Sequence, residues 1–276
     1  MKNTTSVIIP AYNEEASIGD CLTSLQGQSL KSDEIIVVDD GSTDKTVNII
    51  EKLSVKLFKQ NHLGPGSARN LGAKEAKGDI LVFVDADMTF DKDFIKNLTA
   101  PISSGKTKGV FNTDELVANW TSPWARCWNY NQNLYTKARM DPKSHHESED
   151  FRAILKKEFD RVGGFDLTGY TDSRTLVKKL GFRPTSVEDA VSYHKNPEIL
   201  REIFSQARWI GRRRTRFGII GKFLNLIHYS LPYSLAVGFI KSVKTGEFRF
   251  IIFKIIYDLG FSVGTLDSLL TGKTAK

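Results

Sequence analysis

The stretch DILVFVDADMTF, residues 79–90, places two acids directly after an unbroken apolar run. Residues 80–84 carry no polar side chain, which is typical of a strand that is buried on both faces of a sheet. Asp85 and Asp87 follow, separated only by Ala86. Because ligands of open α/β sheets bind beyond the carboxyl ends of the strands, the stretch predicts a central strand that ends at a binding site.

Three short runs rich in β-branched residues precede this stretch and alternate with helical patterns. They are SVIIPA (6–11), EIIVVDD (34–40) and VKLFKQ (55–60). Such alternation predicts βαβ units that feed a Rossmann-like, mostly parallel central sheet flanked by helices, which is an α/β fold. A further strand is predicted at TSVEDAVSYH, residues 185–194.

Composition and charge limit the class of protein. The chain has 276 residues, 40% of them hydrophobic, which is enough for one large domain or one domain with an appendage. Residues 1–194 hold 25 Lys and Arg against 27 Asp and Glu, whereas residues 195–276 hold 14 against 5, so the last segment nets +9. A basic excess confined to one terminal segment suits a polyanion such as an anionic membrane surface.

The cysteine content and the N-terminus indicate a reducing compartment. Only Cys21 and Cys127 occur, which argues against a disulfide framework. The apolar stretch at the N-terminus is too short for a signal peptide. We therefore expect a protein of the cytoplasm or of the cytoplasmic face of the cell membrane, bound there peripherally.

Two apolar segments, residues 223–240 and 248–270, lie near the C-terminus, and polar or charged residues interrupt both. This pattern favours helices that lie in or on a membrane over helices that cross it. The alternative is an ordinary pair of amphipathic helices that pack on their own protein. We predict a first domain at residues 1–221 and a hydrophobic or amphipathic helical segment at residues 222–276.

Acidic residues follow three of the predicted strands. YNEE comes after the first, DDGSTD after the second and DAD after the fourth, so carboxylates gather at one sheet edge. Like charges this close repel each other unless cations offset them. Mg²⁺ or Mn²⁺, which bridge carboxylates to substrate phosphates, would meet this need. The loop HLGPGSARN (62–70) adds glycines for close backbone approach and Arg69 for a phosphate or ribose.

These motifs, taken in order, resemble a known family. SVIIPAYNEE, EIIVVDDGSTD, GPGSARNLGAKEAKGDILVFVDAD and VGGFD are similar to segments of family 2 glycosyltransferases, which have the GT-A fold. The resemblance covers roughly residues 5–210. It implies an inverting, metal-dependent transfer of a sugar from a UDP- or GDP-sugar to a lipid-linked or polysaccharide acceptor. Nucleic acid is not among the expected partners.

The resemblance also implies roles for single residues. Asp40 would read the edge of the base, and Arg69 would contact the nucleotide. Asp85, with Ala86 beside it, would face the ribose and the metal, and Asp87 would bind the metal that holds the diphosphate. His194 would be a second metal ligand, although a structural histidine is an equal alternative. The wall that holds the nucleoside would consist of Pro10, Ala11, Tyr12 and Glu14.

The general base is the least regular part of the resemblance. Family members carry a Glu-Asp pair shortly after the segment that matches GGFD, whereas this chain has YTDSRTL, in which Asp172 stands without the preceding acid. Asp172 is the predicted catalytic base, whose removal of a hydroxyl proton is typically worth about 10²–10⁴-fold in rate. An acceptor that is already a phosphate anion would need no base.

Two other functions fit part of the sequence. ILVFVDADMT also matches the pattern of haloacid-dehalogenase-type phosphatases, with Asp85 as nucleophile and Asp87 as acid and base. That alternative leaves the other motifs unexplained. A membrane-associated scaffold without catalysis is the non-enzyme alternative, which the altered base segment favours and the intact DAD disfavours.

Overall fold

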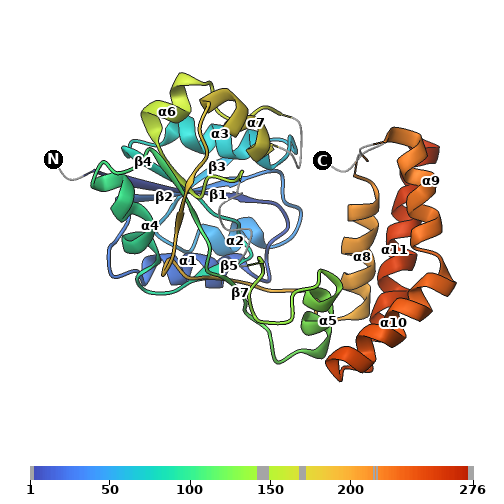
Figure 1. Ribbon diagram of the computed structural model, residues 1–276. Helices are drawn as coiled ribbons and strands as arrows, with labels where there is room; N and C mark the ends of the chain where they lie inside the picture. The colour runs from blue at the N-terminus through green and yellow to red at the C-terminus, as the bar shows by residue number, and fades with distance from the viewer. Residues whose placement is uncertain (1–2, 142–148, 168–171, 214, 216, 273–276) are drawn as a thin grey trace. The chain divides into compact units, whose positions relative to one another are not determined.

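The computed structural model describes residues 3–141, 149–167, 172–213, 215 and 217–272, without the side chains of residues 172–174. The chain divides into two compact units. The sheet unit comprises Met1–Leu116 and Met140–His194, and the helical unit comprises Val117–Arg139 and Lys195–Lys276. Figure 1 shows the elements of each unit.

A seven-stranded sheet, counted over the described residues, forms the centre of the sheet unit in the order β3-β2-β1-β4-β8-β6-β9. β1 pairs with β2 and β4, β2 with β3, and β6 with β9, all in parallel, whereas β8 runs antiparallel to β4 and β6. The prediction of a mostly parallel sheet with the DILVF strand near its centre is therefore confirmed. The strands are β1 (Thr5–Ala11), β2 (Glu34–Asp39), β3 (Lys56–Lys59), β4 (Ile80–Phe83), β6 (Gly109–Asn112), β8 (Ala153–Leu155) and β9 (Thr185–Val187).

Helices cover both faces of this sheet (Figure 1). Successive residues of a strand point to opposite faces, so Val7 and Ile9 of β1 pack in one hydrophobic cluster and Ile8 packs in another. The first cluster includes residues of α1 (Ile18–Gln26), α2 (Thr46–Ile50) and α4 (Phe94–Ser103). The second includes residues of α3 (Pro65–Glu75), α6 (Lys156–Arg161) and α7 (Asp172–Leu180).

A small second sheet lies beyond the end of β4. Its strands are β5 (Met88–Phe90), β10 (Ser192–His194) and β7 (Glu115–Val117), in the order β5-β10-β7. β5 and β10 are antiparallel, with His194 opposite Met88. This pairing brings His194 next to the acids that follow β4.

The helical unit is built around its last helix. α11 (Phe250–Thr271) packs against the other helices of the unit, which are α5 (Pro123–Asn131), α8 (Leu200–Gly211), α9 (Gly218–His228) and α10 (Leu231–Thr245). α5 and α8 thus belong to the same compact unit as the predicted segment 222–276. The predicted domain limits themselves stay a prediction.

Among the described residues, no single helix is long and apolar enough to cross a membrane. α9 and α10 reach that length and hydropathy only together, with a bend of 60° between them.

Gly72 of α3 offers a test of how tightly this helix packs on the sheet. A Cβ atom there would lie 2.5 Å from Ile8 Cγ2 and 3.3 Å from Val38 Cγ2. We predict that Gly72→Ala lowers the free energy of unfolding by about 1–3 kcal/mol through overpacking. In α1, Gly19→Ala is the matched control, because its Cβ would meet only Ile49 Cγ2 at 3.7 Å.

The control substitution should raise the free energy of unfolding by up to about 1 kcal/mol, since alanine is the better helix former. Denaturant unfolding of both variants beside the unsubstituted protein measures the difference. Equal effects of the two substitutions would contradict the close packing of α3 on β1.

Candidate active site

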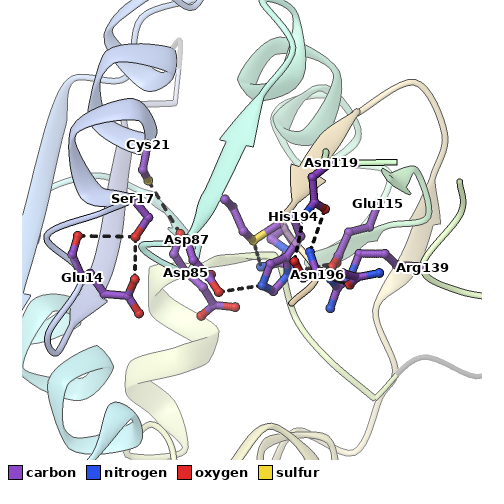
Figure 2. A network of polar contacts seen from close by, with 12 residues as sticks. Glu14, Ser17, Cys21, Asp85, Asp87, Glu115, Asn119, Arg139, His194 and Asn196 are labelled. Carbon is purple, nitrogen blue, oxygen red and sulfur yellow. Dashed lines mark hydrogen bonds and ion pairs between the residues drawn. The ribbon is translucent and has the colours of Figure 1, made fainter. Parts of the chain in front are cut away.

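The two acids of DILVFVDADMTF lie just beyond β4 and point to the same side of the chain. Val84, Ala86 and Met88 are buried, whereas Asp85 and Asp87, which alternate with them, are partly exposed. Figure 2 shows Glu14 on one side of the two acids and His194 on the other. Ala86 is thus a core residue, and the alternation places both carboxylates on the same side of the chain.

Asp85 is held by a cation from the neighbouring helix. Arg69 Nη2, on the first half of α3, donates to Asp85 Oδ1 at 2.7 Å. Burial would raise the pKa of Asp85, but the charges of Arg69 and Arg152 outweigh it and lower this pKa to about 2. Asp85 therefore stays ionised, and the structure brings together two residues that the sequence assigned to one site.

Asp87 is held by His194, and His194 contacts a second carboxylate. The Nε2 atom of His194 lies 2.7 Å from Asp87 Oδ2, and its Nδ1 atom lies 3.2 Å from Glu115 Oε1. Arg152 Nη2 lies 3.5 Å from the other oxygen of Glu115. Each ring nitrogen of His194 thus faces one carboxylate, and Arg152 lies next to the second of these, Glu115.

Asp87 and His194 are the two predicted metal ligands, and their donor atoms converge. A carboxylate oxygen and an imidazole nitrogen are donors that Mn²⁺ accepts, and Mn²⁺ and Mg²⁺ commonly complete their shell with substrate phosphates and water. A carboxylate on the far nitrogen, here Glu115, is the usual support of a metal-binding histidine. Within the described residues, no cluster of three or more His, Cys, Asp or Glu side chains has the arrangement of a metal site. The residues present fit a cation that shares its shell with a substrate.

Glu14 closes the site on the side of β1. Ser17 Oγ donates to Glu14 Oε2 at 2.5 Å. Burial raises the pKa of Glu14 to about 7; the hydrogen bond from Ser17 opposes this rise, and the charges of Asp87 and Asp85 add to it. Glu14 is therefore a carboxyl group that carries a proton over much of the acidic range.

Asp40 lies in a loop on the other side of β1, and its carboxylate is fully engaged. Asp40 is buried, with 3% of the residue exposed. The backbone N–H groups of Leu63 and Gly64 donate to its two oxygens at 2.9 Å each. Gln60 Nε2 lies 2.6 Å from Oδ1 and His62 Nδ1 lies 3.0 Å from Oδ2. Asp40 thus fixes the loop that leads into α3.

The predicted nucleoside wall begins at the end of β1. Pro10 and Ala11 are the last residues of that strand, and Tyr12 follows with a half-exposed ring. The ring of His62 stacks on Tyr12 with centroids 4.1 Å apart and planes at 29°. His62 therefore joins Tyr12 to Asp40, which the sequence did not indicate.

Asp172 is the first residue of α7, and its side chain lies outside the described part of the structure. Its assignment as a base stays a prediction. Glu115, Arg152 and His62 are the residues that sequence reasoning missed. Glu115 and Arg152 lie outside every motif, and only the pairing of distant strands brings them to the acids. His62 is the first residue of the loop HLGPGSARN, and only this position indicated that it could lie near the site.

Comparison with known proteins identifies the family. The protein-family model described as glycosyl transferase family 2 matches residues 6–163, which is more than half of the chain. The chain belongs to glycosyl transferase family 2. The matched range contains Glu14, Arg69, Asp85 and Asp87, and it ends before Asp172 and His194. Family 2 membership favours glycosyl transfer over the phosphatase alternative.

Two relatives show how far the similarity extends. The poly(ribitol-phosphate) beta-N-acetylglucosaminyltransferase TarS of Staphylococcus aureus is 41% identical over 103 residues, which are 34% of this chain and 18% of TarS. The O-antigen chain rhamnosyltransferase RfbN of Salmonella typhimurium is 27% identical over 217 residues, 73% of this chain and 69% of RfbN. The match therefore spans less than a fifth of the length of TarS.

Solved structures show the same fold at low identity. TarS residues 1–349 from S. aureus in complex with UDP-GlcNAc align with a TM-score of 0.57 at 20% identity, over 99% of this chain and 93% of that chain. The mannosyltransferase PcManGT from Pyrobaculum calidifontis, in complex with GDP-Man and Mn²⁺, aligns with a TM-score of 0.60 at 19% identity, over 96% and 88%. The family 2 chain thus has a GT-A-like α/β fold.

The protonation of Glu14 predicts a pH-dependent stability. Its pKa is about 7 in the folded chain against an ordinary value of 4.5. As pH rises above 4.5, Glu14 loses its proton in the unfolded chain before it does so in the folded chain. The free energy of unfolding therefore falls between about pH 4.5 and pH 7 and stays constant above pH 7. We predict that Glu14→Gln, without donor or metal, stabilises the protein by up to about 3 kcal/mol at pH 8 and much less at pH 4.5.

Thermal unfolding at several pH values measures this effect. Glu188→Gln, at an exposed position, is the control and should change the unfolding temperature little at any pH. A Glu14→Gln difference that stayed constant between pH 4.5 and 8 would contradict the raised pKa.

Proposed function

We propose that the protein transfers a sugar from a nucleotide-diphosphate sugar to an acceptor, with inversion at the anomeric carbon. The observation that carries this proposal is the arrangement at the end of β4, where Asp87 converges with His194 and Asp85 pairs with Arg69. Membership in glycosyl transferase family 2 supports it, as do relatives that are named glycosyltransferases.

The diphosphate would bind between these two pairs. Asp87 Oδ2 and His194 Nε2 would hold Mg²⁺ or Mn²⁺ together with diphosphate oxygens. Such a cation supplies a Lewis acid that offsets the negative charge of the leaving diphosphate. Glu115 keeps His194 oriented, because it engages the nitrogen that faces away from Asp87. Arg69 offers a fixed positive charge next to Asp85 for the nucleotide.

The nucleoside would lie against the end of β1. Tyr12 presents a half-exposed ring on which a base can stack, with Pro10 and Ala11 as the neighbouring wall. For Asp40 to read the edge of the base, one of its present donors must move. Gln60 and His62 are its side-chain donors and could leave without loss of a backbone hydrogen bond, and the ring of His62 is half-exposed. Ala86 packs in the core, so it would contact the nucleotide through its backbone.

The names of two relatives support a proposal for the acceptor class. TarS is named for poly(ribitol-phosphate) and RfbN for the O-antigen chain. We propose a polysaccharide or lipid-linked acceptor, with Asp172 as the base that takes the proton of its hydroxyl. The proposed place of action is the cytoplasmic face of the cell membrane, supported by the net charge of +9 in residues 195–276.

Substitution of Asp87 tests the proposed metal site. Asp87→Asn keeps an oxygen that can accept from His194 but removes the charge that a divalent cation needs. We predict a loss of metal-dependent sugar transfer or donor hydrolysis of about 100-fold or more. Asp91→Asn, at an exposed acid four residues further on, is the matched control. Unchanged hydrolysis by Asp87→Asn with Mn²⁺ present would refute the assignment.

The nucleotide is tested by ligand-induced stabilisation. A donor at a hundred times its dissociation constant stabilises a protein by about 2.7 kcal/mol. We predict that either UDP-sugars or GDP-sugars, but not both equally, raise the unfolding temperature when Mn²⁺ is present. Each nucleotide without its sugar is the control that separates recognition of the base from recognition of the sugar. The absence of a shift with every donor would argue against nucleotide-sugar binding.

A further inference from the structure

Two helices of the helical unit present lines of apolar side chains to the exterior. On α10 the line recurs every four residues, and its members are 45–61% exposed: Leu231, Leu235, Phe239 and Val243. On α11 the members recur every seven or four residues and are 45–86% exposed: Ile252, Leu259, Leu266 and Leu270. Residues spaced in this way share one side of a helix. We call these eight residues the α10–α11 face.

The two lines lie on the same side of the unit. α10 and α11 run side by side, with Gly238 close to the backbone of Ile251 (Figure 1). The side of α11 that carries Phe253 and Tyr257 packs against Trp128 of α5, with ring centroids 6.3 and 5.5 Å apart. These residues are one and five positions after Ile252, so they lie about 100–140° around the helix from its line. The α11 line therefore faces away from α5.

On α10, Lys241 marks the side that faces α5. Its ammonium group donates to the carbonyl oxygen of Asn131 in α5 at 3.3 Å and also to that of Tyr130. Phe239 and Val243 are two positions away in either direction, which is about 200° around the helix. The α10 line thus faces away from α5 as well.

The acids of these helices are neutralised within the unit. Lys254 and Asp258 form an ion pair of 2.7 Å between side chains that are 5% and 1% exposed, and Ser234 donates to the same carboxylate at 2.7 Å. This pair lies under the α10–α11 face, between the two helices. The buried ion pair therefore adds no net charge beneath the α10–α11 face.

The cations gather at the edge of the face. Asp267, one position after Leu266, accepts from both Arg208 and Arg212 of the α8 end, at 2.8 Å each. Two arginines thus share one acid, which leaves a positive charge beside the apolar line. The positive edge agrees with the composition of residues 195–276, which hold 14 basic and 5 acidic residues.

An apolar surface with a positive edge complements an anionic lipid surface. A second copy of the chain would bring two positive edges together, which like-charge repulsion disfavours. We propose that the α10–α11 face docks on an anionic phospholipid bilayer, with both helices in the plane of the membrane and Arg208 and Arg212 at the lipid phosphates. This inference rests on the peripheral association proposed above and names the surface that makes it.

The chain provides its own matched control on α9. That helix packs on the opposite side of α11, where Lys222 donates to Ser268 at 2.5 Å and the ring of Tyr229 packs on Phe261. Its exposed apolar residues include Phe223 and Ile227, which are 57% and 70% exposed. Removing them lowers the hydrophobicity of the unit without touching the α10–α11 face.

The test compares two double variants of the full chain, Leu235→Asp with Phe239→Asp on α10 and Phe223→Asp with Ile227→Asp on α9. Flotation with vesicles of phosphatidylcholine and phosphatidylglycerol measures the binding, and vesicles of phosphatidylcholine alone test the need for anionic lipid. We expect the α10 variant to bind roughly tenfold or more weakly than the unsubstituted protein. We expect the α9 variant to bind within about twofold of it, and salt to weaken the binding of both.

Three results would overturn the inference: equal binding by the α10 variant, loss of binding by the α9 variant alone, or binding that ignores lipid charge. Sedimentation in solution gives a fourth. If the unsubstituted protein were a dimer and the α10 substitutions made it a monomer with unchanged vesicle binding, the face would be a self-association surface. Hydrolysis of the soluble donor, measured on the same samples, reports on the sugar-transfer proposal separately and should not change in either variant.

Discussion

Charge compensation at the end of a buried strand is the constraint on which the sheet unit depends. Two carboxylates on the same side of a chain, two residues apart, repel each other and lose solvation beside an apolar strand. The protein supplies a separate partner for each: Arg69 from α3 for Asp85, and His194 from β10 for Asp87. Arg69 lies on a helix that packs on the large sheet, and His194 lies in the small sheet. The two ion pairs therefore connect the large sheet with the small sheet.

The same side chains include groups that can act as ligands of a divalent cation. Arg69 forms an ion pair with Asp85, whereas His194 contacts Asp87 through a nitrogen that is itself a metal donor. Glu115 remains on the far nitrogen of His194 whichever group occupies the near one. Asp87 and His194 are therefore the residues that would hold a divalent cation, and Glu115 would keep the imidazole of His194 oriented toward it.

The sequence predicted the parts of this site that local patterns encode. An apolar run, an alternation of acids with core residues, and a glycine-rich loop with an arginine are all local, and they located β4, Asp85, Asp87 and Arg69. Glu115 and Arg152 could not be found this way, because their places arise from the pairing of segments that are far apart in the chain. Glu115 belongs to the small sheet β5-β10-β7, and Arg152 directly precedes β8, which lies between β4 and β6 in the large sheet. TSVEDAVSYH, predicted as one strand, forms β9 and β10 in two different sheets. Asp189, with a φ of 61°, lies between them, in a backbone conformation that no strand contains.

The helical unit shows a different limit of sequence reasoning. The apolar segments predicted either membrane association or packing on the protein itself, and the structure shows packing for one side of α11, whereas membrane association stays a proposal. Gly260 and Gly264 let α8 approach this helix so closely that added Cβ atoms would contact the carbonyl oxygens of Phe204 and Arg208. That approach, with the buried Lys254–Asp258 pair against α10, uses one side of α11 for the core and leaves the line through Ile252 and Leu259 outside. Hydropathy averaged along the segment cannot separate the two sides, whereas the positions of the glycines and of the ion pair do.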